Sequence, residues 1–154
     1  MVPVMTIIEA LGSWREAERR WESTGRDDPG YHTAAIGVIS AWLNYQELTP
    51  EAEGSFVLVA DDDLTYVAVG GGVKAALGYE PAELLGRRIE DISAPDLALM
   101  TPSAWHEFLA AGRQDGLYRL LARSGHEVEM VFQARAHHPI PGFHTSRLRP
   151  VENP

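Results

Sequence analysis

LGYEPAELLGRR, at residues 77–88, places two glycines, a proline and a pair of leucines at fixed offsets behind a β-rich run. Glycine permits sharp turns that other residues resist, and proline is well accepted in the first turn of a helix. The segment therefore predicts short helices joined by tight turns. Helices this short are not stable alone, so they need a larger layer of structure to pack on.

Strand-like runs lie on both sides of this segment. Residues 56–60 and 64–69 are rich in β-branched and aromatic residues, and the three aspartates at 61–63 between them are good turn formers, which predicts a β-hairpin. Three further strands are expected behind the segment, at residues 117–123, 126–137 and 143–149. The order is therefore two strands, several short helices and three strands.

The strand expected at 126–137 indicates which side of the sheet is buried. Its even positions from 128 to 136 are apolar, whereas most of its odd positions are charged or polar. Successive side chains of a strand point to opposite faces, so one face is buried and the other is wet or partnered. We predict an α+β fold, in which a five-stranded antiparallel sheet carries short helices on one face.

Two helices are expected at the N-terminus. Apolar residues recur at spacings of three and four from Ile7 to Trp21 and again from Tyr31 to Tyr45, and a turn-forming run at 23–30 separates them. Residues 1–50 are therefore expected to form a helical hairpin, and residues 51–154 a second domain. The hairpin either caps its own domain or mediates dimerisation, and the sequence leaves both open.

From about Glu53 to Pro150 the chain resembles the PAS domains, most recognisably at residues 77–88 and in the helix at 105–112. The resemblance implies the α+β fold described above and a sensory or regulatory role in signalling, not an enzymatic one. It also implies a pocket between the helices and the sheet that holds a small molecule or nothing. Where family members often place a helix-capping asparagine, this chain has glycines at 70–72.

The resemblance and the strand alternation together give an expected pocket lining. A ligand there would favour one packing of the helices on the sheet, and the N-terminal helices would transmit the difference. We expect a homodimer, with a signalling partner or output domain outside this chain. The residues expected to line the pocket are Trp105, Phe108, Tyr118, Met130 and Phe132.

Haem is the cofactor for which the sequence offers a candidate ligand. Haem-sensing relatives place a histidine on the helix before the last three strands, and His106 occupies that region here. The flavin adduct of light-sensing relatives needs a cysteine, and this chain has none, so that chemistry is excluded. A haem sensor with His106 as axial ligand is thus the alternative to a colourless ligand or a pure interaction module.

Other kinds of site are disfavoured by their sequence context. His137, His138 and His144 flank one turn and suggest zinc, but neighbouring residues on a strand point to opposite faces. The glycines at 70–72 start a weak dinucleotide fingerprint that lacks its second parallel strand. A small α+β enzyme would need an acid–base pair, such as His106 or His138 with a carboxylate, and nothing fixes one. We expect no metal site and no catalytic residue.

Composition limits the compartment and the partners. The 154 residues carry a formal net charge of -9, and the basic residues are scattered, which disfavours nucleic acid and anionic membranes as partners. No apolar run approaches the ~18 residues of a membrane span. The absence of cysteine fits a reducing compartment. The sequence therefore indicates a soluble, cytoplasmic protein.

Overall fold

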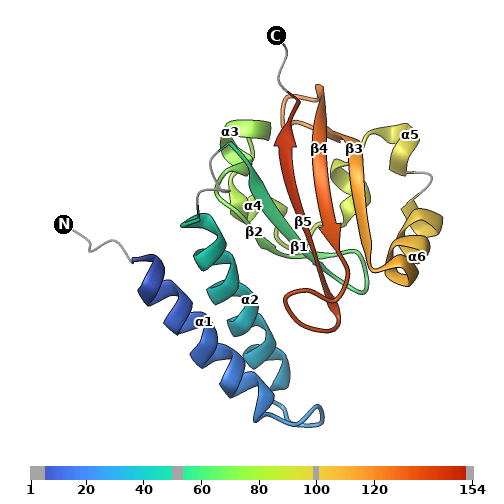
Figure 1. The fold of residues 1–154 in the computed structure, drawn as a ribbon. Coiled ribbons are helices and arrows are strands. Elements are labelled where there is room, and N and C mark those ends of the chain that lie inside the picture. The colour runs from blue at the N-terminus through green and yellow to red at the C-terminus, as the bar shows by residue number, and fades with distance from the viewer. Residues whose placement is uncertain (1–5, 50–53, 99–100, 152–154) are drawn as a thin grey trace. The chain divides into compact units, whose positions relative to one another are not determined.

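Two helices and a mixed helix–sheet unit make up the computed structural model, which describes residues 6–49, 54–98 and 101–151 (Figure 1). The chain divides into two compact units, Met1–Glu53 and Gly54–Pro154. The boundary expected after residue 50 falls on residues outside the described ranges. None of the helices in those ranges has the length and apolar character that a membrane span requires.

The first unit is a pair of helices, α1 (Ile7–Glu22) and α2 (Tyr31–Glu47). Thr6 starts α1, because its hydroxyl accepts a hydrogen bond from the backbone N–H of Glu9 and so satisfies a free donor of the first turn. Aromatic contacts join the helices: the rings of Trp14 and Tyr45 lie 5.5 Å apart between centroids, and those of Trp21 and Tyr31 lie 6.2 Å apart. The helical hairpin expected from the aromatic spacing is therefore present.

A five-stranded antiparallel sheet forms the centre of the second unit, as the sequence predicted (Figure 1). Its spatial order is β2-β1-β5-β4-β3, so β1 lies beside the last strand of the chain. The strands are β1 (Phe56–Asp61), β2 (Tyr66–Val69), β3 (Arg113–Leu121), β4 (Glu127–Arg135) and β5 (Phe143–Pro150).

Short helices connect β2 to β3. In Figure 1, α3 and α4 lie near β2, and α5 and α6 lie beside β3. The helices are α3 (Val73–Leu77), α4 (Pro81–Leu84), the 3₁₀ helix η2 (Ile89–Ile92), α5 (Pro95–Ala98) and α6 (Thr101–Ala111).

The segment at 77–88 forms the turns that its sequence predicted. Gly78 ends α3 with a φ of 86°, a left-handed conformation that favours glycine. Pro81 opens α4, and the side chains of Glu80 and Glu83 cap its start reciprocally. The leucine pair divides between core and solvent, because Leu84 is completely buried whereas Leu85 is 49% exposed.

Hydrogen bonds and an ion pair connect residues 77–88 to the C-terminal end of β3 and the residues just after it. The backbone N–H of Arg123 donates to the carbonyl of Leu77 at 2.8 Å, and the Tyr79 hydroxyl donates to the carbonyl of Leu121 at 3.2 Å. The Arg123 guanidinium also pairs with Glu83 at 3.0 Å. These short helices are thus held in place by the sheet and not by their own length.

Several strand ends differ from the sequence prediction, and three of the differences have a clear structural reason. Strand β2 begins at Tyr66, two residues late, because Leu64 has a φ of 59° and belongs to the preceding turn. Strand β4 ends at Arg135, because His137 has a φ of 53° that breaks the extended backbone. Strand β3 begins at Arg113, four residues early, because pairing with β4 extends it through polar residues that lack a strand pattern.

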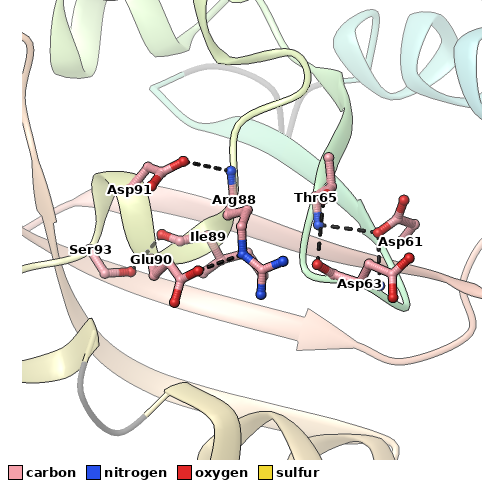
Figure 2. A network of polar contacts seen from close by, with 8 residues as sticks. All are labelled: Asp61, Asp63, Thr65, Arg88, Ile89, Glu90, Asp91 and Ser93. Atoms are coloured by element: carbon pink, nitrogen blue, oxygen red, sulfur yellow. Dashed lines mark hydrogen bonds and ion pairs between the residues drawn. The ribbon is translucent and has the colours of Figure 1, made fainter.

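Asp61 ends β1, and Asp62 and Asp63 form the expected turn; Figure 2 shows hydrogen bonds of Asp61 and Asp63. One carboxylate oxygen of Asp61 accepts from the backbone N–H groups of Asp63 and Thr65, at 2.9 and 3.1 Å. Beside it, the backbone N–H of Arg88 donates to the Asp91 carboxylate at 2.9 Å. A β-bridge between Thr65 and Arg88 joins the two groups immediately before the start of β2.

Gly72 shows why the position before α3 is glycine. A Cβ atom there would lie 2.5 Å from the carbonyl oxygen of Ser55 and 3.1 Å from the Cβ of Phe56. The helix starts without a side-chain cap, in agreement with the missing asparagine. A close backbone approach therefore takes precedence over capping at this position.

The apolar core of the second unit lies between the sheet and the short helices. The inner face of each of the five strands contributes side chains to this core, and so do α3, α4 and η2. All of these elements are therefore packed on one core. Its buried residues are Phe56, Leu58, Ala60, Tyr66, Val69, Val73, Leu77, Leu84, Ile92, Leu120, Met130 and Leu148.

Candidate functional site

A cavity of about 330 Å³ lies between α6 and the inner face of the sheet. Its exposed lining residues, Ala104 on α6 and Gln114 and Leu117 on β3, indicate that it opens at the β3 side. The full lining consists of Leu58, Ala60, Tyr66, Ile89, Ala104, Trp105, Phe108, Gln114, Leu117, Tyr118, Leu120, Phe132, Ala134, His144, Thr145, Ser146 and Leu148.

Sheet register explains which strand residues reach the cavity. Ala134 of β4 lies opposite Ser146 of β5, and Ser146 lies opposite Leu58 of β1. Cross-strand partners share one face of a sheet, so these three side chains lie on the same side. Phe132 and Leu148 form the next pair along that face. The side chains that point to the inner face of the sheet thus form one wall of the cavity, and α6 forms the other.

Four of the five residues predicted to line a pocket do line this cavity: Trp105, Phe108, Tyr118 and Phe132. The fifth, Met130, does not. It is completely buried in the core with Leu84 and Ile92. The alternation along β4 correctly placed Met130 on the inner face. However, the packing of the short helices decides which part of that face is solid core and which part is cavity.

His106, the predicted haem-ligand candidate, lies on the exposed side of α6 and does not line the cavity. Its neighbour Trp105 turns inward instead, since successive residues of a helix point about 100° apart. The geometry therefore does not favour His106 as the ligand of a group held in the cavity. Haem binding itself stays a prediction, which the visible absorption spectrum of the purified protein tests.

The histidine that does line the cavity is His144, on β5, which the sequence pattern suggests only as a zinc ligand. It is 3% exposed. Its ring stands edge-on to Trp105, with centroids 5.1 Å apart, and lies 6.2 Å from Phe108. The pairing of Ala60 with His144 across β1 and β5 places it on the inner face, a register that no local pattern specifies.

Both ring nitrogens of His144 have hydrogen-bond partners. The backbone N–H of His137 donates to Nδ1 at 2.9 Å. A backbone amide can only donate, so Nδ1 carries no proton, and the proton of the neutral ring is on Nε2. Nε2 then donates to the Asp62 carboxylate at 2.7 Å. Burial lowers the pKa of His144, and the Asp62 carboxylate partly offsets this, so the ring is neutral in the fold at neutral pH.

Asp62, His137 and His144 bring three potential metal-ligand atoms within 4.8 Å of one another. Asp62 thus joins the two histidines in place of His138, which the sequence pattern groups with them. Nδ1 of His137 accepts the backbone N–H of Gly142 at 3.0 Å, just as Nδ1 of His144 accepts that of His137. Coordination through either nitrogen of these rings would displace a backbone N–H or force a proton against one. The geometry favours a hydrogen-bonded cluster over a metal centre.

Two hydroxyls of the cavity wall donate to other groups of the protein. The Tyr118 hydroxyl donates to Ser93 at 2.8 Å, and the Thr145 hydroxyl donates to the carbonyl of His138 at 2.6 Å. Burial raises the pKa of the Tyr66 hydroxyl far above its ordinary value, so this group stays protonated. Trp105 differs, because its Nε1–H is buried and has no hydrogen-bond partner. Trp105 therefore carries a buried donor that has no protein partner.

Comparisons with known proteins give a fold relationship and no close relative. No family model matches the sequence, and no curated protein matches it. The PAS domain of an HTR-like protein from Haloarcula marismortui is 20% identical, with a TM-score of 0.60 over 89% of this chain and 99% of that chain. A PAS domain from Colwellia psychrerythraea is 16% identical, with a TM-score of 0.55 over 63% of this chain and 86% of that one. This chain therefore has the fold of a PAS domain, as its segment at 77–88 predicted.

Proposed function

We propose that this chain is a sensory or regulatory domain that binds a small ligand in the cavity between α6 and the sheet. The observation that carries the proposal is the cavity itself: about 330 Å³, lined mainly by apolar and aromatic side chains and open beside β3. Ligand sites of proteins are typically concave, mostly apolar and furnished with a few polar groups. The solved PAS domains of similar fold are consistent with a signalling role.

Binding is favoured over catalysis by the chemistry of the wall. Among the described residues that line the cavity there is no carboxylate and no lysine or arginine. His144 is the ionisable group most suited to proton transfer, but both of its ring nitrogens are engaged by Asp62 and by the backbone of His137. General acid–base catalysis needs a group with a free position toward the substrate.

A shift between two packings of α6 would carry the signal. Helix α6 has only 11 residues and forms one wall of the cavity, so a ligand that contacts both α6 and the sheet stabilises one distance between them. A ligand shifts such an equilibrium only by its difference in affinity for the two states. We place the receiver of this signal in a partner or domain outside this chain, in the cytoplasm.

Filling the cavity tests the ligand proposal. Ala134 lines the cavity from β4, so Ala134→Phe is expected to occupy the space and to abolish ligand-induced stabilisation. The measurement is the melting temperature of the wild-type protein and the variant against a library of metabolites. Gln133→Phe is the matched control, because Gln133 is the exposed neighbour on the same strand and points to the other face. If no compound stabilises wild type more than Ala134→Phe, the proposal is wrong.

We also propose that the chain forms homodimers through its helical unit. The side chains of Ile7 and Ile8 on α1 are 41% and 79% exposed, which leaves apolar surface for a second copy to cover. We expect sedimentation equilibrium to give a dimer for wild type, and Ile8→Glu to weaken it by about tenfold or more because dimerisation would bury a charge. Ser13→Glu, at an exposed polar position of α1, serves as control. A monomeric wild type contradicts the proposal.

A further inference from the structure

The cavity wall is uncharged, and this restricts the ligand. None of the described lining residues is a lysine, arginine, aspartate or glutamate. The nearest carboxylate shown to approach the wall is that of Asp62, which is exposed and accepts the Nε2–H of His144. An ion moved into such a wall loses its hydration without gaining a partner of opposite charge, which costs several kcal/mol or more.

Aromatic rings form two walls of the cavity. Trp105 and Phe108 of α6, with centroids 5.6 Å apart, stand on one side, and Trp105 also contacts the ring of His144 on β5. Tyr118 of β3 and Phe132 of β4 pack edge-to-face at 6.0 Å on the sheet. Aromatic groups prefer offset or edge-to-face partners at centroid distances of about 4.5–7 Å. A planar ring between α6 and the sheet would find such partners on both sides.

Trp105 carries a buried hydrogen-bond donor that has no partner in the protein. Buried donors without a partner cost about 1–3 kcal/mol, so they are rare in native proteins. Trp105 Nε1–H is such a donor, whereas the hydroxyls of Tyr118 and Thr145 already donate to protein oxygens. A ligand acceptor that engages the indole N–H would remove this cost. The volume of about 330 Å³ lies at the small end of ligand pockets.

From these three observations we infer that the cavity binds a small, uncharged, planar aromatic compound that carries a hydrogen-bond acceptor, such as a carbonyl oxygen, for Trp105. The inference rests on the proposed ligand-binding function and adds the chemical class of the ligand. The uncharged wall disfavours charged ligands. The aromatic side chains favour a ligand with a planar ring, and the indole N–H of Trp105 favours one with a hydrogen-bond acceptor.

Four indoles that share one ring separate these requirements. Two of the probes are neutral: indole-3-carboxaldehyde carries a carbonyl acceptor, and indole carries no carbonyl. The other two are charged: indole-3-acetate is an anion, and tryptamine is a cation. Their dissociation constants would be measured by NMR titration of the full chain. We expect the aldehyde to bind about tenfold or more tightly than either ion, and Ala134→Phe to abolish its binding.

Trp105→Phe tests the acceptor separately from the ring. This variant keeps an aromatic wall and removes the N–H, so it should weaken the aldehyde by about fivefold to tenfold and leave indole nearly unchanged. Equal weakening of both probes would show that the loss is one of packing, and would overturn the acceptor assignment. If Trp105→Phe does not fold, the ratio of aldehyde to indole affinity in the wild type gives the same test.

Two results would overturn the ligand class. The first is binding of indole-3-acetate or tryptamine as tightly as the aldehyde, with both lost in Ala134→Phe; the cavity would then still be a ligand site, and the proposed function would survive. The second is failure of all four probes to bind. The metabolite library then decides the proposed function independently, since a charged or non-aromatic compound that stabilises wild type but not Ala134→Phe would support it.

Discussion

Leu84→Ala will lower the free energy of unfolding by about 2–5 kcal/mol, the range for removing a large buried side chain and leaving a cavity. Leu84 is completely buried in the core cluster, although it lies in a helix of only four residues. The substitution removes the side chain through which α4 contacts the rest of the core. Urea unfolding followed by circular dichroism measures it, and an unchanged m-value would show that the variant still unfolds in one step.

Leu85→Ala is the matched control for Leu84, since the chemistry is identical and the residue is the next one in the chain. Leu85 is 49% exposed, so the substitution should change the unfolding free energy by at most about 0.5 kcal/mol. Equal losses for the two variants would contradict the division of the leucine pair into a core residue and a surface residue. A large loss for Leu85 alone would indicate that a partner covers it.

His144→Leu will lower the free energy of unfolding by about 1–3 kcal/mol, because it removes the acceptor of a backbone donor. Leucine restores much of the volume but cannot accept the N–H of His137, and it also ends the contact with Asp62. His106→Leu is the control, since His106 is exposed on α6, and its effect should stay within about 0.5 kcal/mol. Similar values for the two variants would mean that the His144 hydrogen bonds contribute nothing.

His144 also makes the free energy of unfolding depend on pH, and the direction of its pKa shift gives the sign of that dependence. Burial lowers the folded-state pKa of His144, Asp62 opposes this, and His137 adds to it, so the unfolded chain binds a proton more readily than the fold does. The contribution is full above the unfolded pKa of about 6.5 and is lost as the pH falls through the folded pKa. Burial and Arg135 lower the pKa of His138 in the same direction.

Unfolding free energies at a series of pH values from neutral to moderately acid test this linkage. Wild type should lose stability steadily as the pH falls below about 6.5. His144→Leu should lose less over the same interval, because the contributions of groups such as His138 and Glu83 remain while that of His144 is gone. Parallel curves for the two proteins would show that His144 titrates alike in the folded and unfolded chain, and would refute the linkage.

Local sequence patterns were sufficient for the elements and their order. Glycine and proline at 77–88 specify turns by backbone sterics alone, and the Gly78 φ of 86° follows from the residue type. The alternation along β4 placed Met130 and Phe132 on the inner face for the same reason, because side-chain direction in a strand depends only on its period of two. These signals act over a few residues, so a single sequence shows them.

The tertiary structure determined features that these local sequence patterns do not specify. Strand β3 starts at Arg113 because β4 offers it partners, and Met130 became core while Phe132 became cavity wall because of where the helices pack. Asp62 and His144, 82 residues apart, meet only through the register of β1 with β5.

The sequence by itself thus determined an α+β sheet with short helices, and the inward direction of Trp105 and Phe108. The tertiary structure alone determined that His144 faces the cavity. The physical reason is range: turns, caps and periodicity depend on neighbouring residues, whereas a cavity and its hydrogen bonds depend on the packing of segments that are distant in the chain.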